Sequence, residues 1–483
     1  MNGFMKRTVT VDIGTTRTKL GYFDENGNQL ISEVQATPTR ADAWGTIYDS
    51  DALWSLIVRY LRRLDDHNRQ TLEKIAIAGV GESGGLVGED LRLNSPMILW
   101  HDQRGEAAIN RLSAGERLRI YAITGLPANA NYSISKIRWA VAAAPNPVGD
   151  NKWLNVSEYV AALMTGQRWA EYSLASRTMA LDLRSATWSP EVCGLFQVDP
   201  SLLPRLEPAS FGYPLTKNFA ALCKLPPDVQ VHVVGHDHMV GGVGAALSQG
   251  ELLNSTGTTE GILFLRKEPS LDSTSATAML ANGIDCESGA YTLFASIPTG
   301  GSAFETLQHL LAMSESMLLT CIAALNDRYL AGQIDLARIP VVIPHFRGSP
   351  PPEKRASARG VIANLSSDVQ AEDIVLGCFL GLAMQFKMVA DLFPDPPASV
   401  KVIGPASENY LWLHLKADVL GTDLSVSKFP EVVSRGAQAL ASADRCDWSG
   451  CHPIEIATDQ RRHEQIQEWF SLAKPIFERL EGV

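Results

Sequence analysis

Residues 11–20, VDIGTTRTKL, join a single carboxylate to a turn of glycine and threonine. Asp12 stands in an apolar run that predicts a strand over residues 8–13, and Gly14, Thr15 and Thr16 separate it from a second predicted strand over residues 19–23. Backbone N–H groups and hydroxyls at such a hairpin tip can bind an anion, and a neighbouring carboxylate can bind magnesium. The segment therefore indicates a site for a nucleoside triphosphate, with a plain hairpin as the alternative.

The same arrangement recurs in the second half of the chain. Residues 254–260, NSTGTTE, stand between predicted strands at 251–255 and 261–266, so that Thr256, Gly257 and Thr258 form a second tip. A repeated strand–turn–strand unit indicates an internal duplication, in which a nucleotide lies between two related domains. We place these domains at residues 1–247 and 248–483.

A third acidic candidate follows the predicted strand at 229–235. Asp237 lies in the sequence GHDH, directly before a helix of small residues. Ligands of open α/β sheets gather at the carboxyl ends of strands, where a carboxylate can accept a proton from a sugar hydroxyl during phosphoryl transfer. Two alternatives stay open: His236 and His238 could form a metal pair, or Asp237 could cap the following helix.

Two polar segments follow predicted strands in the first half. Glu82 and Ser83 lie in GVGESGG after the strand at 74–79, and Trp100, Asp102 and Arg104 lie in WHDQR. Such groups can bind the hydroxyls of a polyol, and an indole can stack on the apolar face of a sugar. Together the segments favour a polyol pocket, although each alone could be a capping or salt-bridged cluster.

Residues 404–409, GPASEN, follow a predicted strand at 400–403 and open a helix. Small residues at this turn would let the backbone lie against a flat ligand such as adenosine. Gly404, Ser407 and Asn409 are therefore candidate nucleoside contacts, and the alternative is an ordinary Gly-Pro turn capped by serine.

The elements that must position these groups alternate between strand and helix. Helices are predicted at residues 51–65, 103–114, 157–165 and 371–392, a surface excursion at 200–227, and an irregular loop at 346–360. This order is typical of an α/β protein with a mixed sheet, and 483 residues exceed one ordinary core.

Composition excludes several classes of protein. With 42 basic and 53 acidic residues, the net charge of −11 argues against nucleic acid or an anionic membrane as a partner. No run of about 18 apolar residues predicts a membrane span. The seven cysteines are scattered singly, as in a reduced cytoplasmic protein, and no second Cys-x-x-Cys pair supports a zinc site near Cys446 and Cys451.

In this order and spacing, the segments resemble those of the FGGY carbohydrate kinases, of the same superfamily as actin and hexokinase. DIGTTRTK and GTTEG are similar to the two phosphate motifs of that family, WHDQR and YSISKIRW to its substrate segments, and GHDHMVGGVGAAL to its catalytic segment. RGSPPPEKRASARG resembles a characteristic loop of the second domain, and GPASENYLWLHLKADVLG resembles the adenosine segment.

The resemblance implies two actin-like (ribonuclease H-like) domains around a cleft, each with a mixed five-stranded sheet flanked by helices. It makes Asp237 the general base and places Asp12 and Asp237 beside magnesium. It implies phosphate contacts from Gly14, Thr15, Thr16, Lys19, Thr256, Gly257 and Thr258, sugar contacts from Glu82, Ser83, Trp100, Asp102 and Arg104, and nucleoside contacts from Gly404, Ser407 and Asn409.

The expected activity is ATP-dependent phosphorylation of a terminal hydroxyl of a ketose, with ATP and Mg²⁺ as cofactors and a homodimer as the assembly common in the family. A glycerol- or tetritol-type polyol kinase and a non-catalytic ATP-binding regulator are the alternatives. The chain departs from the family pattern at 404–406, where Gly-Pro-Ala replaces three glycines, at Ser349-Pro350, which replaces Glu-Arg, and at Glu82-Ser83.

Overall fold

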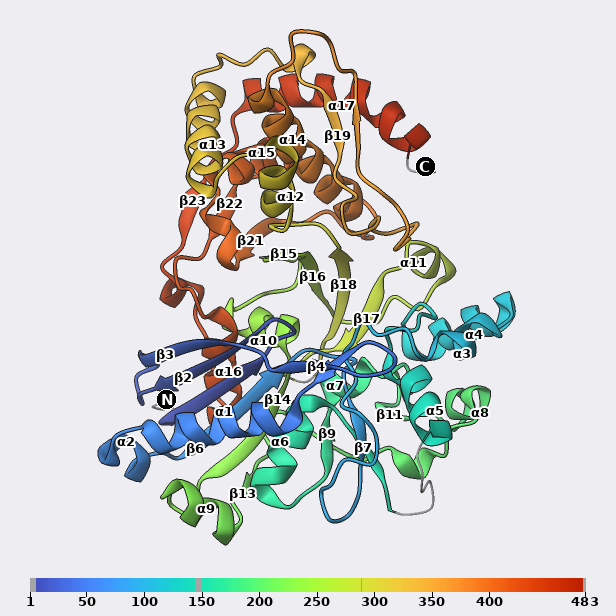
Figure 1. Ribbon diagram of the computed structural model, residues 1–483, viewed down its shortest axis with the longest axis vertical. Helices are drawn as coiled ribbons and strands as arrows, with labels where there is room; N and C mark the ends of the chain where they lie inside the picture. Colours follow the sequence, from blue (N-terminus) through green and yellow to red (C-terminus); the bar gives the residue numbers. More distant parts are fainter. Residues whose placement is uncertain (1–5, 144–149, 288, 481–483) are drawn as a thin grey trace.

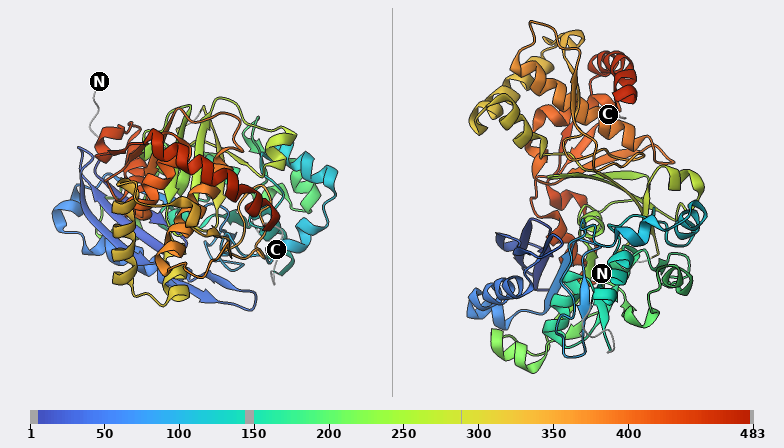
Figure 2. Two further views of the ribbon diagram at one scale, coloured as in Figure 1. Left: turned by 90° about the horizontal axis from the view of Figure 1, so that it is seen from above. Right: turned by 45° about the vertical axis from the view of Figure 1, so that its right-hand side comes forward.

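The computed structural model describes residues 6–143, 150–287 and 289–480, which form two halves, each built on a mixed sheet (Figure 1). The two halves are stacked along the long axis of the molecule, and the right-hand view of Figure 2 shows the same division from another direction. The fold class predicted from the sequence, α/β with two actin-like domains, is confirmed.

The first sheet has the order β13-β14-β6-β1-β2-β3. Its strands are β13 (Tyr213–Pro214), β14 (Gln230–His236), β6 (Lys74–Gly79), β1 (Thr8–Ile13), β2 (Arg17–Phe23) and β3 (Gln29–Ala36). The second sheet has the order β17-β18-β16-β15-β21-β22-β23. Its strands are β17 (Ala281–Ile284), β18 (Tyr291–Ile297), β16 (Glu260–Arg266), β15 (Glu251–Thr256), β21 (Ser399–Ile403), β22 (Leu424–Val426) and β23 (Ile454–Ile456).

Five strands in each sheet share one pairing pattern. β1 pairs antiparallel with β2 and parallel with β6, and β15 pairs antiparallel with β16 and parallel with β21. The prediction of five strands is wrong in number, because β13, β17 and β23 add short edge strands. The matched pattern nevertheless places the two Gly/Thr tips at equivalent points of the two sheets.

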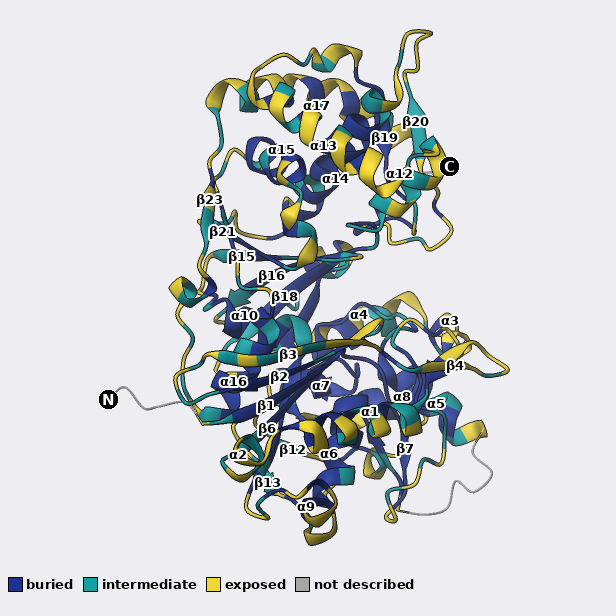
Figure 3. Ribbon diagram, turned by 60° about the vertical axis from the view of Figure 1, so that its left-hand side comes forward, coloured by how far each residue is buried: buried dark blue, intermediate teal, exposed yellow. Residues whose placement is uncertain are grey.

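Burial follows the alternation of side chains along the strands. All six residues of β1 are buried, whereas β3 alternates and is largely exposed, and Figure 3 shows it as a lighter edge beside dark central strands. β1 is thus buried on both faces, although its sequence TVTVDI alternates polar and apolar residues.

Several predicted helices have different bounds. α1 (Ser50–Arg63), α6 (Val156–Thr165) and α14 (Ala371–Ala390) lie close to their predicted ranges. The helix predicted at 103–114 is wrong: α3 covers only Glu106–Asn110, and α4 (Ala114–Thr124) begins anew where Ser113 and Glu116 form a capping box. The excursion at 200–227 contains short β12 (Arg205–Glu207), β13 and α9 (Lys217–Cys223).

The helix α14 is long and apolar enough to cross a membrane by length and composition, but 78% of that window is buried inside the protein. It packs against α15 (Tyr410–Leu420) and β19 (Val341–Ile343) and forms the core of the second half. The helices α12 (Ala303–Leu311) and α13 (Glu315–Leu330) meet at a sharp bend. They are long and apolar enough to cross a membrane only if both are counted together as one span.

Two helices connect the two halves. α16 (Val432–Ser442), from the second half of the chain, packs on β1 and β6 of the first sheet, and α10 (Asp237–Gly244) reaches toward β16 and β15 of the second. Figure 1 shows α16 beside the first sheet. Since α10 also packs against β14 and β6 of its own sheet, it contacts both sheets.

The helices α10 and α16 contact each other through one glycine on each helix. A Cβ on Gly244 would lie 2.0 Å from the carbonyl oxygen of Val432, and a Cβ on Gly436 would lie 2.1 Å from that of Val240. Any side chain at either position would therefore push the helix backbones apart.

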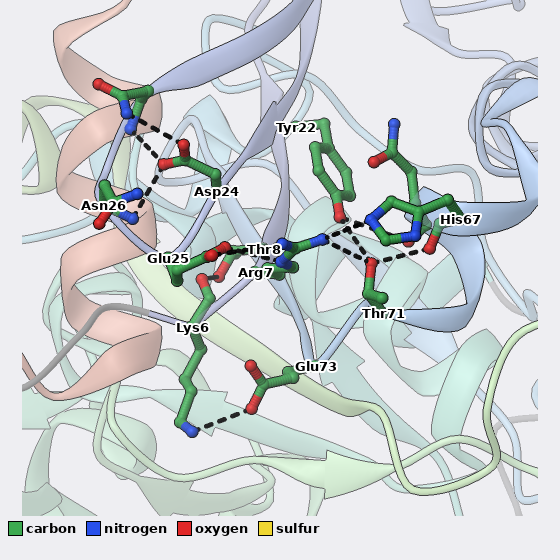
Figure 4. A network of polar contacts seen from close by, with 12 residues as sticks. Lys6, Arg7, Thr8, Tyr22, Asp24, Glu25, Asn26, His67, Thr71 and Glu73 are labelled. Carbon is green, nitrogen blue, oxygen red and sulfur yellow. Dashed lines mark hydrogen bonds and ion pairs between the residues drawn. The ribbon is translucent and has the colours of Figure 1, made fainter.

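The start of β1 is tied to its neighbours by surface charges, which Figure 4 shows from close by. Arg7 pairs with Glu25 at 2.7 Å and donates to the Thr71 hydroxyl at 3.0 Å, and Lys6 pairs with Glu73 at 3.0 Å. Exposed pairs of this kind add little to stability, because solvent screens them. These pairs lie at the start of β1, whereas Asp12 lies near its end. They therefore align the strand at a distance from that carboxylate.

We expect Gly436→Ala to destabilise the protein by about 1–3 kcal/mol, because overpacking forces the two backbones to move. Urea unfolding of the purified protein measures the change. Gly194→Ala, in α8 (Pro190–Phe196), is the matched control, since a Cβ there meets nothing within 4 Å. Equal stability of the two variants would contradict tight packing at the crossing.

Candidate active site

The first hairpin holds a buried carboxylate with an unsatisfied oxygen. Asp12 is 6% exposed, and its Oδ1 has no hydrogen-bond partner among the residues that the structure describes. Burial raises the pKa of Asp12 to about 7; Lys19 opposes this rise, whereas Asp237 and Glu431 reinforce it. The Lys19 ammonium pairs with Glu431 Oε2 at 3.0 Å. These four charged groups from β1, β2, α10 and the start of α16 therefore act on one another.

Asp237 lies at the carboxyl end of β14, as its first helical residue. Its carboxylate accepts the N–H of His238 at 2.7 Å and lies 3.4 Å from His236 Nε2. Burial lowers the pKa of His236 to about 3, so this ring is neutral. The Asp237 side chain is 23% exposed and can thus be reached by a ligand.

The geometry does not support the two alternative roles of the GHDH segment, a helix cap at Asp237 and a metal pair of His236 and His238. The N-cap position of α10 belongs to His236, which makes no side-chain capping bond. No group of three histidine, cysteine, aspartate or glutamate side chains suited to a metal occurs in the part of the chain that the structure describes. The histidine-metal interpretation therefore lacks its further ligands.

The tip of the first hairpin is fixed by Trp100 and Thr37. The Trp100 indole N–H donates to Thr15 Oγ1 at 2.9 Å, and Thr37 Oγ1 donates to the carbonyl of Gly14 at 2.9 Å. Thr16 is exposed at the end of the turn. Trp100 thus connects the predicted phosphate tip to the predicted sugar segment, a role that the sequence did not suggest.

The second tip is held by a segment that sequence reasoning missed. The N–H groups of Gly300 and Ser302 donate to the Thr258 carbonyl at 3.1 and 3.2 Å, and that of Gly301 donates to Gly257 at 2.7 Å. The only signal was the glycine pair after β18, in the sequence IPTGGS. This support fixes the backbone of the second tip.

Gly404 lies directly on the second tip. Its φ is 102°, and a Cβ would lie 2.2 Å from the Thr256 carbonyl oxygen, so both conformation and space require glycine. Ser407 Oγ donates to the Gly404 carbonyl at 2.7 Å, and Asn409 caps α15 by accepting the Trp412 N–H at 3.1 Å. These two polar side chains therefore shape the turn beside the tip.

A buried ion pair supports the second hairpin from behind. Lys416 of α15 contacts Glu260 on β16 and donates to Asn254 Oδ1 at 2.8 Å. Both charged side chains are almost fully buried, and desolvation raises the pKa of Glu260 and lowers that of Lys416, while each partner opposes the shift of the other. Neither residue was predicted, because the pairing joins positions 156 residues apart.

The predicted sugar segments meet at two ion-paired clusters. Glu82, with a φ of 53°, accepts two bonds from Arg177 at 2.8 and 2.7 Å. Lys136 donates to the carbonyl of Glu82 at 3.2 Å and to that of Trp100 at 2.8 Å, and burial lowers its pKa to about 7. Ser83 is buried, and its hydroxyl has no partner.

Asp102 and Arg104 are brought together, but they bond mainly to each other. Arg104 Nη2 lies 2.7 Å from Asp102, its Nη1 lies 2.9 Å from Asp42, and its guanidinium stacks 4.8 Å from the Trp139 ring. The Arg104 side chain is fully buried. The sequence did not identify Asp42, which lies on the distant β4–β5 hairpin (Thr39–Ala41 and Thr46–Tyr48).

Known proteins of similar sequence and fold are kinases. A glycerol kinase of Limosilactobacillus reuteri is 24% identical over 90% of this chain and 88% of its own length, and one of Enterococcus casseliflavus is 25% identical over 94% and 91%. The same fold occurs in a gluconate kinase of Lactobacillus acidophilus (TM-score 0.86, 19% identity, 99% and 98% coverage) and a xylulose kinase of Rhodospirillum rubrum (TM-score 0.86, 20%, 99% and 99%).

The family itself is shown by two matches that together span most of the chain. Residues 8–244 match the N-terminal domain of the FGGY family of carbohydrate kinases, and residues 252–444 match its C-terminal domain. The first match contains Asp12 and Asp237, and the second contains the Thr256–Thr258 tip and Gly404. The chain belongs to the FGGY family of carbohydrate kinases.

Proposed function

We propose that this protein transfers the γ-phosphoryl group of ATP to a terminal hydroxyl of a small polyhydroxy acceptor, with Asp237 as the general base. The observation that carries this proposal is the placement of a partly exposed Asp237 within the electrostatic reach of Asp12, at the strand ends. A carboxylate there can accept the hydroxyl proton as phosphoryl transfer begins.

In this proposal, the tips of the two Gly/Thr hairpins bind the phosphates of ATP. The hydroxyls of Thr15, Thr16, Thr256 and Thr258 supply donors, and Lys19 supplies a positive charge. Gly14 and Gly257 form the two turns, and their N–H groups donate to the carbonyls of Arg17 and Thr259. Gly404, Ser407 and Asn409 form the turn beside the second tip, where the nucleoside would lie. Because the tips belong to different halves, we propose that the chain divides near residue 247 and that the halves close around the nucleotide.

Asp12 and Asp237 suit magnesium, because this ion prefers a few carboxylate oxygens completed by phosphate and water. The unpartnered Oδ1 of Asp12 is such a donor. When bound, magnesium would neutralise charge on the phosphates. The residues of the chain then orient the acceptor, exclude water and hold its proton at Asp237.

A ketose is the acceptor that the sequence favours, and the similarity to glycerol kinases supports the polyol alternative. The non-catalytic alternative rests on the altered residues 404–406, but the retained Gly404 keeps the close approach to Thr256. ADP release measured across a panel of ketoses, glycerol and tetritols tests the proposal. Release that no polyhydroxy acceptor stimulates would favour the regulator.

We expect Asp237→Asn to lower kcat by about 10²–10⁴-fold, since the amide cannot accept the proton. A coupled ADP assay measures turnover, and thermal unfolding should be nearly unchanged. Asp228→Asn, an exposed position before the other end of β14, is the matched control. Turnover of the Asp237 variant equal to that of this control would refute the base.

We expect the free energy of unfolding of Asp12→Asn, relative to that of the nucleotide-free wild type, to rise as the pH increases from about 4 to about 7. The folded pKa of Asp12, about 7, exceeds its ordinary 3.8, so its protonated form favours the fold below pH 4 and this contribution is lost as the pH rises through 7. Urea unfolding at several pH values measures the difference, again with Asp228→Asn as the control. A difference independent of pH would contradict the buried, protonated carboxylate.

A further inference from the structure

A cavity of about 230 Å³ lies between the two halves of the molecule. The first half contributes residues 171–172, 183–186 and 208–209 to its walls, and the second half contributes residues at the turn between β17 and β18. The helix α7 (Tyr172–Ser176) packs against β17 beside it, where the halves meet (Figure 1). An engineered cavity of about 150 Å³ binds benzene, so this one has room for a small organic molecule.

The walls of the cavity are mainly apolar and carry two carboxylates. Leu183 and Pro208 of the first half line it together with Ile284 of the second. The carboxylates come from different halves, Glu171 from the first and Asp285 from the second. Among residues 6–143, 150–287 and 289–480, no lysine, arginine or histidine lines the cavity. A ligand would therefore contact apolar surface and acidic oxygens.

One oxygen of the Glu171 carboxylate has no donor. The residue is only 1% exposed, and its Oε2 accepts the Ser173 hydroxyl and the N–H groups of Ser173 and Leu174, at 2.9 and 3.1 Å. Its Oε1 accepts no hydrogen bond from the part of the chain that the structure describes. Because a buried polar atom without a partner costs free energy, this oxygen is a ready acceptor for a ligand.

The electrostatics of the cavity favour a positive charge. Burial raises the pKa of Glu171 to about 7 and that of Asp285 to about 6, and Asp285 reinforces the rise at Glu171. Two further acids act on this pair: Glu158 beside Glu171 and Glu287 beside Asp285. An anionic ligand would be repelled by these groups, whereas a cation would reduce the repulsion between the two carboxylates.

The cavity is connected to the strand that carries the proposed base. The Ser173 hydroxyl, which donates to Glu171, accepts the N–H of His236 at 2.9 Å and the Cys286 thiol at 3.4 Å. Gly235 has a φ of 128°, and a Cβ there would lie 2.6 Å from Cys286 Sγ. The missing side chain thus lets groups from both halves contact the end of β14.

We infer that this cavity is a second binding site, for a small organic cation whose primary ammonium lies between Glu171 and Asp285 and whose apolar body packs on Leu183 and Ile284. An ammonium supplies three donors, enough for both carboxylates. The site shares no lining residue with the groups proposed to bind ATP or its acceptor, and it does not depend on phosphoryl transfer. Since its walls come from both halves, the bound cation would link them.

The test is calorimetric titration of the full chain with benzylammonium, benzyl alcohol and benzoate, which are similar in shape and differ in charge. A pH of about 8 keeps the amine cationic and lies above the pKa values of both carboxylates. We expect benzylammonium to bind at least about tenfold more tightly than benzyl alcohol, as for a charge-assisted hydrogen bond, and benzoate not to bind. Asp285→Asn should weaken the binding of benzylammonium about tenfold. Glu268→Gln, at an exposed acid outside the cavity, should not change it.

A second variant tests the location by steric block. Ala290 lines the cavity and is half-buried, so Ala290→Leu should fill part of the space and abolish binding. Benzylammonium should raise the Tm of the wild type and of Glu268→Gln, but not that of Ala290→Leu.

Three results would overturn the inference: no binding of benzylammonium to the wild type, equal affinity for benzyl alcohol, or unchanged binding in both Asp285→Asn and Ala290→Leu. Kinase turnover does not enter these measurements. A failure of the proposed function would therefore leave their outcome unaffected, and a failure here would leave the kinase intact.

Discussion

The structure depends on the close contact of α10 and α16, in which glycine on each helix meets a carbonyl on the other. Asp237 is the first residue of α10, and Glu431 directly precedes α16. The crossing therefore sets the distance between the proposed base and the Lys19–Glu431 pair at the first hairpin. A change in helix separation would move two charged groups of the site together.

The crossing also makes each half incomplete without the other. Ala437 and Leu440 of α16 are buried against Ala76 and Ala78 of β6. α10 contacts the second sheet through Gly241 and Gly242, whose missing side chains admit Ile403 and Leu263. Because small residues allow two helices and two sheets to approach closely, this contact holds the two halves together.

Charged side chains are concentrated where the two halves meet, and several of them cost free energy of folding. Asp12 has an unpartnered oxygen, Glu82 sits at a positive φ, and Arg177 has an unused donor. Buried polar groups and strained backbone cost of order 1–3 kcal/mol each and cluster at functional sites. The second hairpin is supported from behind by the Lys416–Glu260 pair and by the hydrogen bonds of residues 300–302 to its tip.

The sequence alone determined the two strand–turn–strand units, the internal duplication and the position of Asp237 after a strand. These are local patterns, since a buried strand, a Gly/Thr turn and a helix of small residues can each be read within ten residues. Only the tertiary structure decided that Trp100 binds Thr15, that Glu431 pairs with Lys19, that Asp42 completes the Arg104 cluster and that Lys354 reaches Ser296. Each of these contacts joins residues dozens to hundreds of positions apart, and the free energy that selects them comes from packing and burial, which no local pattern encodes.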